Sequence, residues 1–149
     1  MVMAMYALPQ SKVEGKPPKP LKSAPEVEEG ARGWVKLLDV QLNGIVSGRT
    51  RHVIKRFLKR IGFSGVVVEH EPDRNPLLLR LVAVGYAARP VTSEQVRKVA
   101  FLRSALDEVL REAYVKYGHA SKADPEKLRL RLAEVEPSLR KVYYTIAQS

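Results

Sequence analysis

Proline is concentrated near the N-terminus, and it restricts what this end of the chain can form. Five of the ten prolines lie in this part: Pro9, Pro17, Pro18, Pro20 and Pro25. Proline lacks a backbone N–H and its ring fixes φ, so the segment 16–20 can be neither a helix nor a central strand. Few large apolar side chains lie nearby to attach it to a core. The sequence therefore predicts an extended arm over residues 1–30, disordered in the free protein and ordered in an assembly, and one domain over residues 31–149.

The charge of the chain is strongly positive. Lys and Arg number 26 against 16 Asp and Glu, which gives a formal net charge of +10. Such an excess repels itself unless a polyanion or an anionic surface screens it, and nucleic acid is the commonest partner of this kind. The apolar runs are too short to span a bilayer, and the first residues lack the pattern of a secretory signal. We therefore expect a nucleic-acid partner, no membrane, and a location inside the cell or in a virion.

Apolar spacing predicts a mainly α-helical domain. Residues from Trp34 to Leu42 follow a three-to-four spacing that is typical of a helix. Thr50 can cap a second helix that runs to about Ile61, and Gly62 is a plausible C-terminal stop.

The C-terminal half carries clearer helix signals. Thr92 and Gln95 fit a capping box at the start of a long helix over residues 93–117, and Gly118 can end it. Asp124 and Pro125 then begin a further helix. A last short helix is expected over residues 139–146.

Residues 65–84 leave two alternatives open. The β-branched run after Gly65 predicts a strand, and residues 71–76 form a turn or loop. Residues 77–84 are then either a second strand, which would make a β-hairpin, or a helix. The possible cap Asn75 and Pro76 at the first helical position favour the helix.

The second expected helix is the best functional signal. It carries six basic residues with no acidic residue between them: Arg49, Arg51, Lys55, Arg56, Lys59 and Arg60. A merely solvated helix would carry Asp or Glu four residues from its Lys and Arg. Membrane-surface binding and simple solvation are the alternatives, but an uncompensated basic face suits contact with phosphates, where counterion release drives binding. We predict that these residues bind nucleic acid.

The arm is a second basic element, with four lysines among its prolines: Lys12, Lys16, Lys19 and Lys22. An extended lysine-rich arm can follow a nucleic-acid backbone without reading its sequence, although a solubilising tail is the alternative. Apolar residues of the arm and of the long helix predict contacts with a second copy or a related subunit. The residues concerned are Tyr6, Leu8, Leu102, Leu106, Leu110 and Tyr117.

Motifs for catalysis are lacking. The chain has no cysteine, no Walker A loop and no Gly-x-Ser-x-Gly, and its three histidines form no metal-binding pair. Residues 69–73, with their Glu, His and Asp side chains, could hold a cation but fit an ordinary solvated turn better. We therefore expect no enzyme, no catalytic residues, no metal, no cofactor and no small-molecule substrate.

A Pro/Lys arm followed by helices resembles the organisation of the major capsid proteins of filamentous viruses of hyperthermophilic archaea. The absence of the heat-labile residue cysteine is consistent with a thermophilic source. The resemblance implies paired helical subunits that wrap double-stranded DNA in A form. Binding to the backbone of A-form DNA would be independent of sequence. The expected function is therefore that of a structural protein that coats duplex DNA, in a virion.

Two other functions remain open. In a winged-helix transcription regulator, residues 34–42 and 50–61 would form the helix pair and residues 66–84 the wing. A two-stranded hairpin after Ile61 would favour this alternative. A ribosomal or chromatin protein, cytoplasmic or nucleoid-associated, would also carry basic arms.

Overall fold

The computed structural model describes residues 13–118 and 123–139 and combines one sheet with helices. Helical residues make up 42% and strand residues 24% of this described part, so the fold is α+β, and the expected mainly α fold is wrong. The elements in chain order are a short 3₁₀ helix at Leu21–Ser23, β1 at Gly33–Leu42, α1 at Gly48–Arg60, β2 at Ser64–Pro72, β3 at Leu79–Ala87, α2 at Ser93–Tyr117 and α3 at Pro125–Leu132.

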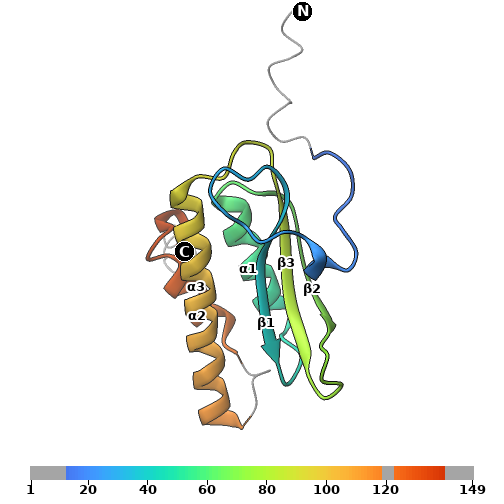
Figure 1. The fold of residues 1–149 in the computed structure, drawn as a ribbon. Helices are drawn as coiled ribbons and strands as arrows, with labels where there is room; N and C mark the ends of the chain where they lie inside the picture. The colour runs from blue at the N-terminus through green and yellow to red at the C-terminus, as the bar shows by residue number, and fades with distance from the viewer. Residues whose placement is uncertain (1–12, 119–122, 140–149) are drawn as a thin grey trace, which may run out of the picture.

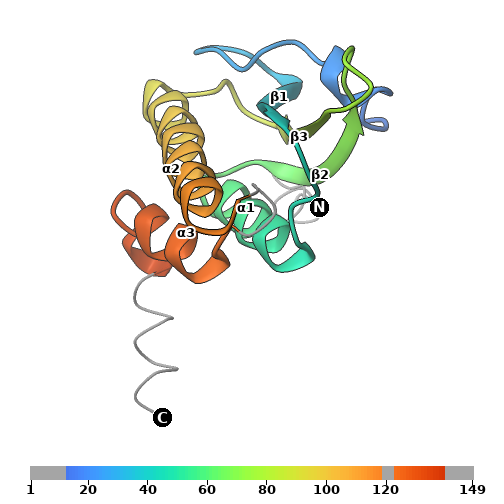
Figure 2. The ribbon, with the colours of Figure 1, turned by 90° about the horizontal axis from the view of Figure 1, so that it is seen from below.

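The sheet has the strand order β1-β3-β2, and both neighbouring pairs are antiparallel. Strands β2 and β3 form the hairpin that was the alternative for residues 65–84, so this alternative is confirmed. Helices α1 and α2 cover one face of the sheet, and α3 packs against these two helices (Figures 1 and 2). The N-terminal segment crosses the other face of the sheet. The main core lies between the helices and the sheet.

Strand β1 occupies residues that were expected to form a helix. Its register shifts between Lys36 and Leu38, which leaves Leu37 as an extra residue of a β-bulge. As a result the consecutive residues Leu37 and Leu38 both lie in the main core, although a regular strand alternates its sides. This break in the two-residue period produces the apparent three-to-four spacing, and the helix prediction for residues 34–42 is wrong for that reason.

The helix favoured for residues 77–84 is also wrong, because Asn75 closes a turn instead of capping a helix. Its side-chain oxygen accepts from the N–H of Leu77 at 2.9 Å, and its carbonyl accepts from the N–H of Leu78 at 3.0 Å. Strand β3 then runs through the centre of the sheet. Ala83 faces the main core and Val84 the opposite face. A central strand buried on both faces has a continuous apolar sequence, which hides its period.

The long C-terminal helix agrees with its sequence signals. Thr92 and Gln95 form the expected capping box at the start of α2, and Gly118 ends it with a positive φ of 86°. Asp124 caps α3. Helix α1 begins slightly earlier than expected, because Ser47 accepts from the N–H of Thr50. Most of the last expected helix, residues 139–146, lies outside the described residues.

Residues 13–27, called the strap below, are attached to the domain itself. Leu21 is fully buried, and Ala24 lies beside it against the outer face of the sheet. The carboxylate of Glu71 accepts the N–H of Leu21 at 2.6 Å and that of Lys22 at 3.0 Å. Val27 pairs with β1, since its N–H donates to the carbonyl of Lys36. Few large apolar residues were expected to anchor this part of the chain, but burial of Leu21 and Val27 is enough to pack its described part onto the domain.

Candidate nucleic-acid interface

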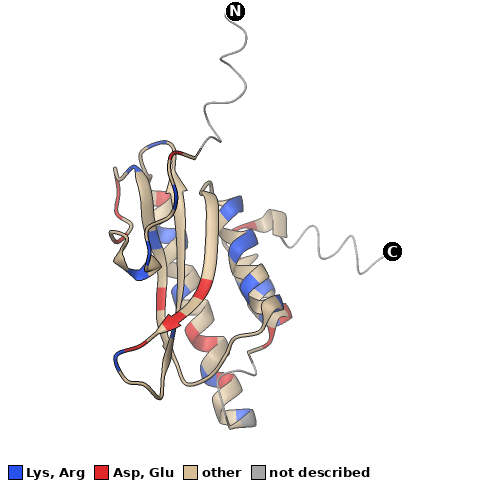
Figure 3. Cartoon of the chain, turned by 90° about the vertical axis from the view of Figure 1, so that its right-hand side faces the viewer, with Lys and Arg blue, Asp and Glu red and all other residues tan. Residues whose placement is uncertain are grey.

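Helix α1 has one buried and one basic face. Ile54, Phe57 and Leu58 are fully buried in the main core. The opposite side, called the basic face below, consists of the exposed residues His52, Lys55, Arg56, Lys59 and Arg60. Figure 3 shows basic positions along α1, the helix to the right of the sheet in that view. Because the apolar side of α1 is fixed in the core, its Lys and Arg side chains lie on the opposite, solvent-exposed side.

No carboxylate neutralises the centre of the basic face. Among the described residues, Lys55, Arg56 and Lys59 form no ion pair. Arg60 donates to the hydroxyl of Ser138 at 3.1 Å. All 16 acidic residues belong to the described part of the chain, because residues 1–12, 119–122 and 140–149 contain no Asp or Glu. No acidic side chain of the protein is therefore available to pair with these three cations.

The two basic positions nearer the start of α1 differ from the rest. Arg49 is highly exposed and lies 3.6 Å from a carboxylate oxygen of Glu126. Arg51 is half-buried and lies close to His70. All six predicted basic residues of α1 are therefore on one element, but Arg51 is the least accessible of them.

The basic face encloses a shallow depression of about 430 Å³. The residues that line it are all on α1: His52, Lys55, Arg56, Lys59 and Arg60. Side chains four residues apart on a helix are separated by about 6 Å along the axis, which suits successive phosphates of one strand. The arrangement can therefore hold anionic oxygens at several points along one line.

The basic face lowers the stability of the isolated helix. Lys55 and Lys59 are four residues apart, as are Arg56 and Arg60, and like charges at this spacing cost about 0.2–0.5 kcal/mol per pair. The first turn of α1 contains no acidic residue, so Arg49 and Arg51 also face the positive end of the helix dipole. A bound polyanion would remove both costs.

The cations of the other helices have partners. On α2, Arg97 pairs with Glu94, and Arg111 with Asp107. Ion pairs also hold Lys98, Arg103, Lys127, Arg129 and Arg131. The positive potential of α2 and α3 is therefore largely cancelled at short range.

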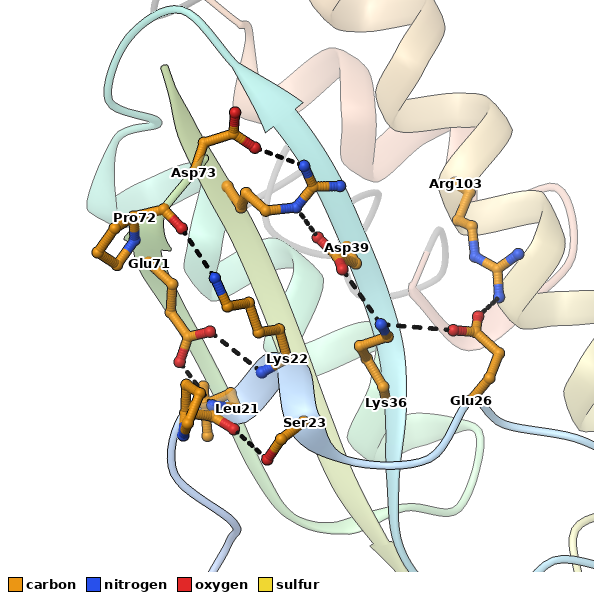
Figure 4. Close-up of polar contacts among 12 residues, drawn as sticks. Leu21, Lys22, Ser23, Glu26, Lys36, Asp39, Glu71, Pro72, Asp73 and Arg103 are labelled. Atoms are coloured by element: carbon orange, nitrogen blue, oxygen red, sulfur yellow. Dashed lines mark hydrogen bonds and ion pairs between the residues drawn. The ribbon is translucent and has the colours of Figure 1, made fainter. Parts of the chain in front are cut away.

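A chain of alternating charges lies on the outer face of the sheet (Figure 4). Arg80 donates from Nε to Asp39 and from Nη1 to Asp73, each at 2.6 Å. Lys36 lies between Asp39 at 3.1 Å and Glu26 at 3.8 Å, and Glu26 also pairs with Arg103. Burial opposes ionisation of Asp39, but hydrogen bonds from Arg80 and Lys36 hold its pKa below the ordinary value. The charges of this surface are satisfied internally.

The lysines of the arm are not brought together with α1. Lys19 pairs with Glu69 at 3.2 Å, and Lys22 donates to the carbonyl of Pro72 at 3.2 Å. Both belong to the strap, on the face of the sheet opposite α1 (Figures 1 and 2). Lys16 is exposed, and Lys12 lies outside the described residues.

The predicted assembly residues are mostly not on the described surface. Leu102 and Leu106 are fully buried in the main core, and Leu110 packs against it while remaining partly exposed. Tyr117 ends α2, but its side chain lies outside the description, as do Tyr6 and Leu8. The burial of Leu102 and Leu106 is therefore explained within a single chain.

Residues 69–73 form part of the sheet rather than a solvated turn. They belong largely to β2, and each acidic side chain has a partner within the chain: Glu69 has Lys19, Glu71 has the strap and Asp73 has Arg80. His70 accepts the N–H of Val46 at 3.0 Å through Nε2. Burial, with a smaller contribution from the charge of Arg51, lowers the pKa of His70 and so favours the neutral imidazole that accepts this bond.

Other kinds of site find no support in the described residues. No group of three or more His, Asp or Glu side chains there is placed to hold a metal ion. None of the helices described combines the length and the apolarity needed to cross a membrane. Comparison with known proteins adds no assignment: no protein-family model, no curated protein and no solved structure matches the chain.

Sequence reasoning missed a groove between α1 and α3. It is lined by residues of both helices, among them Val53 and Pro125, and by Leu139. Val53 is more than seventy residues away from both Pro125 and Leu139 along the chain. Each of the three alone has the character of an ordinary core or turn residue. Only the folded arrangement of the two helices identifies them as parts of one surface.

Proposed function

We propose that this protein binds the sugar–phosphate backbone of nucleic acids through the basic face of α1, without sequence preference. The observation that carries the proposal is the contrast in pairing. Lys55, Arg56 and Lys59 are exposed and lack an acidic partner, whereas the cations of α2 and α3 are paired. Unpaired cations can neutralise phosphates and release counterions, which drives association.

Backbone binding is favoured over base reading by the residues of α1. The helix contains no Asn or Gln, the residues that pair with adenine edges, and its one Thr, Thr50, is buried. The Lys and Arg side chains of α1 can contact the phosphates of any sequence. Duplex DNA remains the proposed main partner, and coating of the duplex remains the proposed role.

The fold weakens the support for two more specific functions, a filamentous-virus capsid protein and a winged-helix regulator. The resemblance to filamentous-virus capsid proteins rested on helices after the arm, but residues 33–42 form a strand in an antiparallel sheet. The hairpin that would favour a winged-helix regulator is present, but the first helix of its helix pair is replaced by β1. We therefore propose sequence-independent binding of nucleic acid. The fold does not favour the more specific role of a filamentous-virus capsid protein.

The test measures how binding to a random duplex depends on salt. The double variant Lys55→Ala with Lys59→Ala should reduce the slope of log K against log salt by about 2, roughly one unit for each lost phosphate contact. Fluorescence anisotropy with a labelled duplex gives the slope.

The matched control removes two paired cations, by Arg111→Ala with Lys127→Ala. It changes the net charge equally but removes the partners of Asp107 and Glu112. This variant should keep the slope of the original protein. Equal losses in both double variants would contradict the proposal, as would one short sequence bound about a thousandfold more tightly than random DNA.

A further inference from the structure

The groove between α1 and α3 differs in chemistry from the depression on the basic face. Its volume is about 310 Å³, close to the lower end of small-ligand sites. Its apolar lining comes from Val53 on α1, Pro125 on α3 and Leu139. The polar lining consists of the cations Arg49, Arg56 and Arg129, the imidazole of His52 and the carboxylate of Glu126. An apolar hollow bordered by cations suits a ligand that joins a flat apolar ring to an anionic group.

The groove is adjacent to the depression on the basic face. His52 and Arg56 line both of them. A nucleotide whose phosphate lies on Arg56 could therefore place its base in the groove, over Val53. Guanidinium groups and imidazole rings are common stacking partners for unpaired bases.

The guanidinium groups at the groove are held in place. Glu126 lies 3.0 Å from Arg129 and 3.6 Å from Arg49, so one carboxylate connects the two arginines. Gly48 forms part of the wall near Arg49. A methyl group added at Gly48 would meet only Arg51, at 3.7 Å, so this part of the wall is open.

We propose that this groove receives one unpaired nucleobase of a strand whose phosphates lie on the basic face. The inference rests on the proposed function and extends it to single-stranded segments, gaps and ends of nucleic acid. The base would enter the groove only when it is free of its complementary strand, because a paired base is stacked within the duplex.

The test separates the base from the phosphate. Affinity is measured for a single-stranded deoxyadenosine oligomer and for an abasic oligomer of the same length, which has the same phosphates. The wild-type chain should bind the base-containing strand about five- to a hundredfold more tightly, as expected for the stacking of one base. Gly48→Leu should obstruct the groove and reduce the affinity for the base-containing strand to that for the abasic strand.

Two further variants distinguish the possible outcomes. Ala100→Leu adds to the exposed surface of α2 a leucine like that of Gly48→Leu, and it should retain the preference for bases. Val53→Phe places a larger side chain in the groove from its other side and should lose this preference. Equal wild-type affinity for the two oligomers, or a preference that survives both filling variants, would overturn the groove assignment. Failure to bind either oligomer, or any duplex, would overturn the proposed function itself.

Discussion

Helices α1 and α2 cover the same face of one sheet, but they differ in how their charges are arranged. Within its 13 residues α1 has six basic residues and no acidic one, while α2 has five basic and four acidic residues in 25. Both helices bury apolar side chains in the same core. The net charge of +10 therefore does not by itself locate a binding surface. The pairing of each cation does, because a paired cation has little potential left for a phosphate.

The largest expected effects on stability come from the buried sides of α1 and α2, which are alike in packing against the core. Phe57 on α1 and Leu106 on α2 are both fully buried. Phe57→Ala should lower the free energy of unfolding by about 3–5 kcal/mol, and Leu106→Ala by about 2–5 kcal/mol, through lost burial and the remaining cavity. Urea denaturation followed by circular dichroism measures both. A loss below about 1 kcal/mol at either position would mean that this helix is not part of the core.

A smaller effect, on the pH dependence of stability, should distinguish the N-terminal ends of the two helices. The loop before α1 is held by neutral His70, which accepts the N–H of Val46, while α2 begins with the capping box of Thr92 and Gln95, which does not titrate. Since the pKa of His70 is lowered in the folded state, its stabilising contribution is complete above the ordinary value of about 6.5. It declines as the pH falls below that value and is lost once the pH passes the lowered pKa.

Denaturation at several pH values between 7.5 and 5 tests this dependence. His70→Gln keeps a hydrogen-bond acceptor without the titration, so the stability of this variant should vary less over the range. His52→Gln, on the exposed face, serves as the control and should behave like the original protein. A pH dependence unchanged by His70→Gln would contradict the assignment.

The smallest effects should have opposite signs on the exposed faces of the two helices. Lys55→Glu places an acid four residues from both Arg51 and Lys59, and should raise the free energy of unfolding by about 0.5 kcal/mol while weakening binding to DNA. Asp107→Lys breaks the ion pair with Arg111 and should lower the free energy of unfolding by about 0.5 kcal/mol. Thermal denaturation gives both values. Stabilisation by Asp107→Lys would show that pairing does not distinguish the helices.

Sequence reasoning succeeded where a local signal decides the structure. The capping box at Thr92 and the positive φ of Gly118 are local features, and α2 has the expected bounds. The acid-free run of α1 is also visible in the sequence, and its apolar period places the core side correctly. These features depend on neighbours within a few residues, so the chain alone reveals them.

The failures share a different cause, which is tertiary context. The bulge at Leu37 and the burial of β3 on both faces alter the two-residue period on which strand prediction depends. The strap is fixed by Glu71, fifty residues away from Leu21, and the groove joins α1 to α3. Such contacts between distant residues leave no periodic signal in a single sequence.

NMR can locate the residues that contact nucleic acid, and it therefore tests directly whether the basic face is the interface. Amide signals of isotope-labelled protein would be followed by NMR during titration with a short random duplex at low salt. We expect the largest shifts in residues 48–60 and little change in residues 93–111 on α2. Shifts centred on α2 or on the strap, with α1 unchanged, would contradict the assignment of the basic face as the nucleic-acid interface.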